Sequence, residues 1–119
     1  MYKEPRGILW RYNVTATQEQ VMKALSVDGI EKTISEVDVE GIDGLERLLG
    51  GGSLVSDEID SEHHVFFDED CFIKQIDGRF QIDALPPIAG KAVLARVTDD
   101  AFSDITWRPE QIETRVKFF

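Results

Sequence analysis

Carboxylate and imidazole side chains gather in one short part of this sequence, and they are the groups that could carry chemistry. The run from Asp57 to His64 holds four acidic residues and the adjacent pair His63 and His64, and a second acidic run follows at 68–70. Such side chains bind hard cations, transfer protons or present negative charge to a partner. Their spacing is the first guide to which use applies.

The spacing argues against a metal site. A calcium loop needs oxygen donors at its first, third and fifth positions and glycine at the sixth, whereas a loop starting at Asp68 would place Phe72 and Ile73 at the last two. The His-Glu-x-x-His pattern of a helical zinc site is missing, and adjacent histidines in a strand point to opposite faces. We therefore expect no metal and no cofactor, with adventitious nickel or zinc binding left open.

Patterns for catalysis are missing as well. The chain has no Gly-x-Ser-x-Gly elbow, its only histidines are adjacent, and nothing separates a general acid from a general base among the carboxylates. Cys71 is the only cysteine, so no internal disulfide can form, and its neighbours Phe72 and Ile73 favour a buried structural thiol. We expect a protein that is not an enzyme; a hydrolase with an unrecognised carboxylate pair is the third hypothesis.

The charge of the chain is segregated. Fourteen of the 23 acidic residues lie between Asp28 and Asp70, where Lys32 and Arg47 are the only cations, and the formal net charge of the chain is −10. A field of this sign repels nucleic acid and bare membrane and attracts a basic partner. The cations elsewhere are dispersed, which disfavours direct nucleic-acid binding.

Length and composition predict one domain over residues 1–119, because 119 residues with 42% hydrophobic content suffice for one core but not for two. No run approaches the roughly 18 apolar residues that cross a bilayer. The first residues also lack the pattern of a signal peptide. We therefore expect a cytoplasmic protein.

The first half of the chain predicts strands and helices in alternation. A capping box at Thr17 to Gln20, followed by Val21, Met22 and Leu25 at helical spacing, predicts a helix that ends near Asp28 and Gly29. The other expected elements are a strand at 7–14, an edge strand at 33–39, and a helix at 42–49 with a capping box at 43–46 and a glycine stop at 50–52.

The second half predicts mainly strands. Strands at 65–67 and 71–76 flank the polar turn 68–70, and Asp77-Gly78 predicts a second hairpin that sets Ile73 opposite Ile82 and packs both with Phe80 and Cys71. Residues 88–97 predict a long central strand. For the C-terminal segment, a helix starting at Pro109 is favoured over a strand at 112–118. The expected fold is α+β, with a single antiparallel or mixed sheet of five to seven strands and two or three short helices on one face.

From Gly41 onward, the order of these patterns resembles a family of short uncharacterised proteins of bacteriophages, plasmids and other bacterial mobile elements. The segments that match are 44–52, 65–70, 88–94 and 109–112, whereas Leu85-Pro86-Pro87 and the helix expected from Thr17 depart from that family. The resemblance implies a mobile-element context within a bacterial host cell and no established chemistry.

These observations lead to one main functional hypothesis. We expect a small acidic binding protein that engages or inhibits a basic, nucleic-acid-binding site of a host protein such as a defence nuclease, by imitating the charge of nucleic acid. The predicted partner-binding residues are Asp57, Glu58, Asp60, Glu62, Asp68, Glu69 and Asp70. The alternative is a self-associating accessory or structural protein that uses exposed apolar residues such as Trp107, Phe118 and Phe119.

Overall fold

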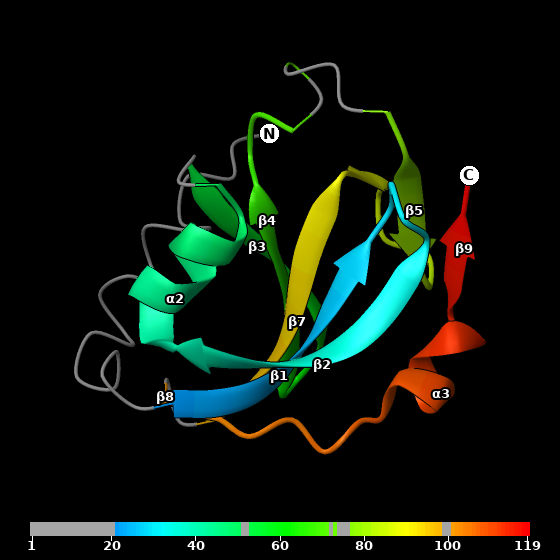
Figure 1. Cartoon of the computed structure of the whole chain (residues 1–119). Coiled ribbons are helices and arrows are strands. Elements are labelled where there is room, and N and C mark those ends of the chain that lie inside the picture. Colours follow the sequence, from blue (N-terminus) through cyan, green and yellow to red (C-terminus); the bar gives the residue numbers. More distant parts are fainter. Residues whose placement is uncertain (1–20, 51–52, 72, 74–76, 99–100) are drawn as a thin grey trace.

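A computed structural model describes residues 21–50, 53–71, 73, 77–98 and 101–119 (Figure 1). The strand expected at 7–14 and the capping box at 17–20 lie outside this part of the chain. The elements are β1 (Val21–Asp28), β2 (Thr33–Glu40), α2 (Gly41–Leu48), β3 (Leu54–Asp60), β4 (His63–Asp68), β5 (Arg79–Ile82), β6 (Ile88–Ala89), β7 (Lys91–Thr98), β8 (Ala101–Ser103), α3 (Pro109–Glu113) and β9 (Val116–Phe118).

The larger sheet has six strands in the order β2-β1-β7-β4-β3, with β8 paired to β7, and its pairs are antiparallel. β7 lies at the centre because its side chains are apolar on both faces. Ala92 and Leu94 join one core cluster, and Val93 and Ala95 join the other. An uninterrupted apolar run of this kind is typical of a strand buried on both sides.

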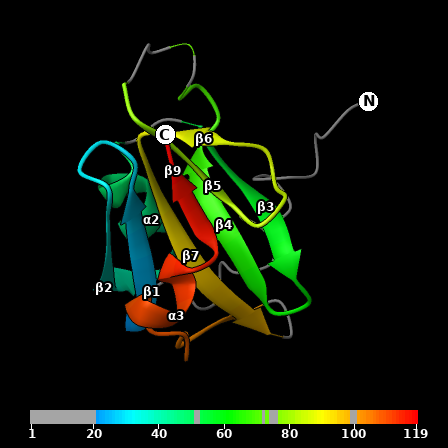
Figure 2. The same ribbon diagram turned by 90° about the vertical axis from the view of Figure 1, so that its right-hand side faces the viewer.

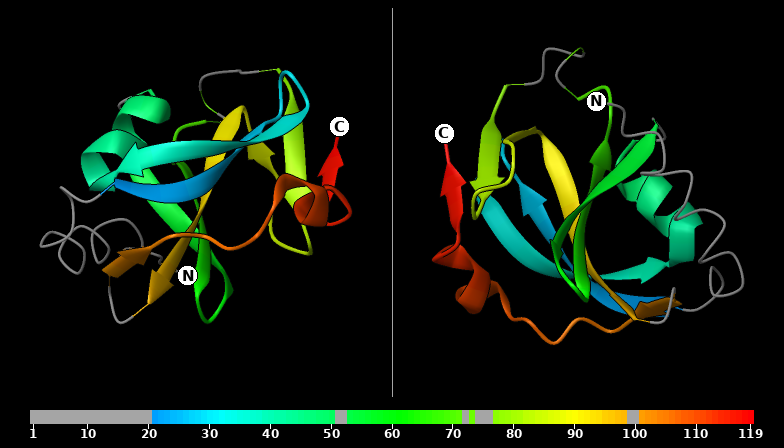
Figure 3. Two further views of the ribbon diagram at one scale, coloured as in Figure 1. Left: turned by 60° about the horizontal axis from the view of Figure 1, so that its bottom comes forward. Right: turned by 180° about the vertical axis from the view of Figure 1, so that it is seen from behind.

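Different layers cover the two faces of the larger sheet. A three-stranded sheet, β6-β5-β9, and helix α3 lie on one face (Figure 2). Phe80 and Ile112 from this layer enter the core. Helix α2 lies on the other face, as the rear view shows (Figure 3), and Ile42 and Leu45 of this helix join the core cluster there. The α+β class is therefore confirmed, whereas a single sheet with its helices on one face is wrong.

The helix expected to end near Asp28 is wrong over residues 21–28, which form β1. This strand pairs with β2 on one side and with β7 on the other. Both rows of its side chains reach a core, since Met22 and Ala24 face one cluster and Leu25 and Val27 face the other. Because both faces are buried, the apolar residues of this segment have a spacing that also fits a helix. Pairing with two neighbouring strands stabilises the strand instead.

The hairpin expected around Asp77-Gly78 is also wrong where the structure describes it. β5 pairs with β6 and β9, so both of its edges are taken by strands other than the predicted partner at 71–76. Cys71 and Ile73 lie in turns, and Ile73 is 77% exposed. Phe80, Ile82 and Cys71 are buried as expected. Residues 72 and 74–76 lie outside the described part.

Three glycines explain this rearrangement. The N–H of Gly29 donates to the carbonyl of Gly90 (2.7 Å), and the N–H of Gly90 donates to the carbonyl of Gly78 (2.9 Å). A Cβ on Gly78 would lie 2.7 Å from the carbonyl oxygen of Gly29, so only glycine permits this crossing of backbones. Gly90, with φ +82°, also divides the expected strand 88–97 into β6 and β7, which belong to different sheets.

Of the expectations for β2, α2 and β4, most are confirmed in whole or in part and one is wrong. β2 is an outer strand of the larger sheet, and α2 ends before Gly50, whose φ is +90°. The residue before α2 is Glu40, so the capping box expected at Asp43 is wrong. The strand 65–67 lies within β4, although its hairpin partner is β3.

The C-terminal segment combines both expected alternatives. Helix α3 begins at Pro109, where the side-chain oxygen of Gln111 accepts from the N–H of Arg108 (2.8 Å). The helix ends at Glu113, and β9 then pairs with β5. Neither helix in the described ranges is long and apolar enough to cross a membrane.

Candidate functional site

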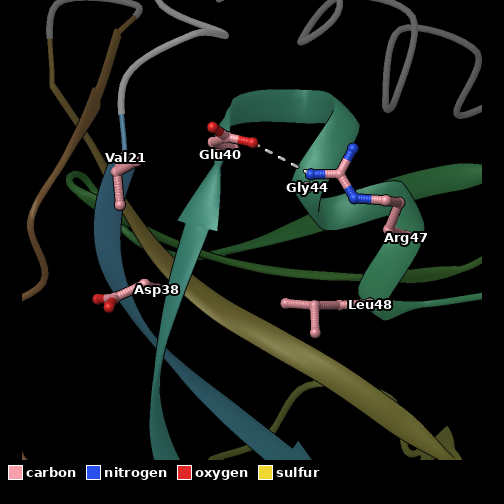
Figure 4. A pocket seen from close by; sticks show the side chains of 6 residues that line it. All are labelled: Val21, Asp38, Glu40, Gly44, Arg47 and Leu48. Carbon is pink, nitrogen blue, oxygen red and sulfur yellow. Dashed lines mark hydrogen bonds and ion pairs between the residues drawn. The ribbon is translucent and has the colours of Figure 1, made fainter.

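An open groove of about 370 Å³ lies between the C-terminal end of β2 and helix α2 (Figure 4). Apolar side chains from Val21 and Leu48 contribute to its wall, and charged groups stand at its rim. The lining residues are Val21, Asp38, Glu40, Gly44, Arg47 and Leu48. The groove thus combines a hydrophobic surface with two carboxylates and one guanidinium.

The direct connection of β2 to α2 builds this groove. Gly41, with φ +59°, turns the chain from Glu40 into the helix without an intervening loop. A Cβ on Gly44 would lie 3.0 Å from the side chain of Val39, so glycine lets the helix approach the strand closely. One helical turn later, Arg47 donates from Nη2 to Oε1 of Glu40 at 3.3 Å (Figure 4).

The carboxylates of β2 form a row along the strand. Glu36, Asp38 and Glu40 occupy alternate positions, about 7 Å apart along the strand. At the end of the strand, the carboxylate of Glu40 reaches toward Arg47, whereas that of Asp38 is turned away from α2 (Figure 4). All three residues are exposed. A smaller groove of about 190 Å³, lined by Lys23, Glu36, Val37 and Asp38, meets the larger one at Asp38. Within the described residues, Glu36 and Asp38 form no ion pair.

The hairpin β3–β4 separates the residues predicted from the sequence into two groups. Asp57, Glu58 and Asp60 lie on β3 and Glu62 lies in the turn after it, whereas Asp68 ends β4 and precedes Glu69 and Asp70. Leu54 is opposite Asp68 and Asp60 is opposite His63. Asp60 and Glu62 therefore lie at one end of the hairpin and Asp68 to Asp70 at the other, on the order of 20 Å apart, with Asp57 and Glu58 between them.

Several of these predicted residues are engaged within the fold. Asp60 binds the ring of His63 (2.8 Å) and Glu62 binds Arg96 (3.1 Å). Asp68 is only 7% exposed, and its carboxylate accepts from the N–H of Asp70 (2.9 Å). Asp57 is half-buried, whereas Glu58 and Glu69 are exposed. A continuous acidic surface is therefore easier to find along β2 than along this hairpin.

A second charged cluster lies where the C-terminal segment meets the hairpin β3–β4. The ring of His63 stacks on Trp107 with centroids 3.7 Å apart and planes 9° apart, and the guanidinium of Arg115 lies 4.7 Å from the centroid of Trp107. Arg115 also binds Asp83 through two hydrogen bonds, of 3.0 and 2.6 Å. Because these side chains come from separate segments, the cluster joins parts of the fold that are distant in sequence.

The contacts within this cluster shift the pKa values of its charged groups. The hydrogen bonds from Arg115 hold the pKa of Asp83 below its ordinary value, and the same contact raises the pKa of Arg115. Burial pushes the pKa of Asp60 upward, but hydrogen bonds from the backbone of Glu62 and from His63 outweigh it, so the pKa is lowered. Burial lowers the pKa of the neighbouring His64.

The pair Asp60–His63 has the residue types of a catalytic base but not the access. Nε2 of His63 is buried and has no hydrogen-bond partner among the described residues, and Trp107 stacks on the ring. Among all the residues that the structure describes, no group of three or more His, Cys, Asp or Glu side chains is arranged to hold a metal ion. The cluster therefore fits a structural role better than a site for substrate.

The groove residues were missed by sequence reasoning, although a signal was present. Glu36, Asp38 and Glu40 alternate along a segment that the pattern already placed at a sheet edge, and such alternation spaces all three evenly along the strand. The position of Arg47 opposite Glu40 depends on the sharp turn at Gly41, which nothing local predicted.

Comparison of the chain with protein-family models, curated proteins and solved structures finds no match.

Proposed function

We propose that this chain is a small, acidic, non-enzymatic binding protein that engages a basic, nucleic-acid-binding site of a host protein, such as a defence nuclease. The observation that carries the proposal is the row Glu36, Asp38 and Glu40, exposed along an outer strand and continuous with the groove beside α2. This surface replaces the hairpin residues 57–70 as the expected contact region.

Charge and shape support this assignment. Regularly spaced carboxylates present to a partner the sign of charge that a phosphate backbone presents, and they steer a basic partner toward the surface. The groove adds apolar area at Val21, which is 61% exposed, and at Leu48. A charged rim around an apolar centre is the usual anatomy of a protein interface. The resemblance to mobile-element proteins is the reason for placing the partner in a bacterial host.

Self-association remains the second candidate because some apolar side chains are exposed. Trp107 and Phe118 are partly buried and pack against the core, whereas Phe119 is 51% exposed and Ile73 is 77% exposed. Light scattering over a range of concentrations tests this candidate. A monomer at high concentration would remove it, and a dimer that dissociates on Ile73→Lys or Phe119→Lys would favour it.

A hydrolase would need two carboxylates in one cleft, and the groove does contain Asp38 and Glu40. Both residues are exposed, and Glu40 is bound by Arg47. A general acid of this class is usually held in a desolvated pocket, which this rim does not offer. The arrangement therefore favours electrostatic binding over acid–base chemistry.

The test is capture from bacterial lysate at low and high salt with two matched variants. The β2 variant carries Glu36→Gln, Asp38→Asn and Glu40→Gln, and the control variant carries Glu31→Gln, Glu58→Gln and Glu69→Gln. Both change the net charge by the same amount at exposed positions. The proposal expects a nucleic-acid-processing protein to be captured by the parent and the control, released by salt, and lost with the β2 variant.

Two results would count against the proposal. Capture that is indifferent to salt would exclude an electrostatic contact. Loss of capture with the control variant and not with the β2 variant would return the contact to the hairpin carboxylates Glu58 and Glu69. Thermal unfolding of each variant should show the parent's melting temperature, because none of the substituted residues is buried.

A further inference from the structure

We propose that Arg47 occupies, in the unbound protein, the position that an arginine of the partner takes on binding. This inference rests on the proposed function. The group that the groove would bind is a partner's guanidinium next to an apolar side chain. Arg47 would compete with that guanidinium for the groove.

The geometry of the groove places Arg47 in that role. It is the only cation among the six lining residues, and its guanidinium crosses from α2 to the carboxylate of Glu40 (Figure 4). Leu48 follows it in the helix and lines the same groove. The chain thus sets its own arginine and an adjoining apolar side chain against the acidic rim, which is the arrangement that a bound peptide would offer.

The contact of Arg47 with Glu40 is suited to exchange. The two side chains are 66% and 58% exposed, and a solvent-exposed ion pair of this kind contributes little to stability. The contact uses one nitrogen and one oxygen, at 3.3 Å. A partner arginine has five N–H donors in a planar fork and can bind a carboxylate through two of them, which is the stronger geometry.

Asp38 supplies the second reason that an outside arginine would be favoured. It precedes Glu40 by two residues on β2, lines the same groove, and forms no ion pair within the described residues. A peptide arginine entering between Asp38 and Glu40 would meet two carboxylates, whereas Arg47 binds one. Charge complementarity therefore favours an arginine-bearing segment as the occupant, with an apolar residue of that segment resting on Val21 and Leu48.

The experiment titrates the full chain with nona-arginine, a defined probe, and measures affinity by calorimetry at low salt. The variants are Arg47→Gln, Lys32→Gln, Asp38→Asn and Glu40→Gln. Lys32→Gln is the matched control because it removes the same charge as Arg47→Gln. Lys32 is exposed and lies beyond the opposite end of β2. Arg47→Gln should tighten binding about two- to fivefold more than Lys32→Gln does, since one exposed ion pair is removed. Asp38→Asn and Glu40→Gln should weaken binding.

The outcomes separate this inference from the proposed function. If Asp38→Asn and Glu40→Gln weaken binding but Arg47→Gln matches Lys32→Gln, Arg47 is not a competitor and the proposed function stands. If Arg47→Gln weakens binding, Arg47 contacts the probe directly, which also overturns the inference. If nona-arginine binds no better to the parent than to the Asp38 and Glu40 variants, the groove is not the basic-partner site and both proposals are wrong.

Discussion

Charged residues occupy two contrasting regions of this molecule. In the cluster around Trp107, Asp83 is bound by Arg115 through two hydrogen bonds and Asp60 is bound by His63. Along β2, Glu36 and Asp38 are exposed and form no ion pair within the described residues. The first region uses charge to connect segments of the fold, and the second displays charge on an open surface.

The two regions differ in how available their carboxylates are to a partner. A carboxylate with an internal cation must lose that contact before it binds another, whereas an exposed carboxylate gives up only water. The density of acidic residues in the sequence pointed to the hairpin 57–70, but the internal contacts of Asp60, Glu62 and Asp68 engage that region within the fold. This difference in availability is the reason for proposing β2 as the contact surface.

The largest change in stability is expected from Trp107→Ala, which disrupts the charged cluster around Trp107. The substitution removes the ring that stacks on His63 and lies under Arg115, so the free energy of unfolding should fall by about 3 kcal/mol. Urea denaturation measures this change. Affinity for nona-arginine should stay at the parent's value, because the groove lies in another region; a loss of affinity without a loss of stability would reverse the assignment of the two regions.

A smaller effect is expected from the pair Asp83 and Arg115. A double-mutant cycle with Asp83→Asn and Arg115→Gln should give a coupling free energy of about 1 kcal/mol, because the contact has two hydrogen bonds but remains partly exposed. The same cycle on Glu40 and Arg47 should give less, since that pair has one contact between exposed side chains. Equal coupling in the two cycles would contradict the distinction between a structural and an exchangeable pair.

The pH dependence of stability should come from the hairpin side of the molecule. Burial lowers the pKa of His64 from the ordinary value of 6.5, so the unfolded chain takes up a proton before the folded chain does. The contribution of neutral His64 to stability is therefore complete above pH 6.5 and declines as the pH falls toward the lower folded pKa. Urea denaturation at pH 7.5 and 5.5 measures this decline, and His64→Gln should reduce it. A stability that increases on acidification through this range would contradict the assignment.

The lowered pKa values of Asp60 and Asp83 act in a separate range of pH. Each carboxylate contributes stability above its ordinary pKa of 3.8, and this contribution is lost as the pH falls through the lower folded value. Acid unfolding of Asp83→Asn should therefore show a smaller loss below pH 4 than the parent shows.

The smallest effect on stability is expected at the groove. Asp38→Asn should change the free energy of unfolding by less than about 0.5 kcal/mol, because the side chain is exposed and has no ion pair within the described residues. Thermal unfolding checks this expectation. A loss of more than 1 kcal/mol would show that Asp38 supports the fold, and it would no longer belong to the displayed row.

Local patterns predicted those parts of the fold that local physics determines. The alternation at 33–39 predicted an edge strand, and the apolar stripe before the glycine run predicted helix α2, because periodicity and glycine stops act over a few residues. The start of α3 at Pro109 was also predicted from a local pattern. The α+β class followed from these elements.

The remaining parts depend on contacts between distant segments. Residues 21–28 became a strand because β2 and β7 flank them, and Asp77-Gly78 failed as a hairpin because Gly78 meets Gly29 and Gly90. The stacking of His63 on Trp107 is equally non-local. No pattern within a short window contains this information, so the way the acidic stretch is distributed over the folded surface could not be predicted from the sequence.

We propose that the carboxylates of β2, and not those of the hairpin, bind a basic partner. The most direct test compares the affinity for nona-arginine of the β2 variant and of the control variant across a series of salt concentrations. We expect the control to keep most of the parent's affinity and salt dependence, and the β2 variant to lose both. Equal losses in the two variants would show that the net charge of the chain, and no particular surface, attracts the partner.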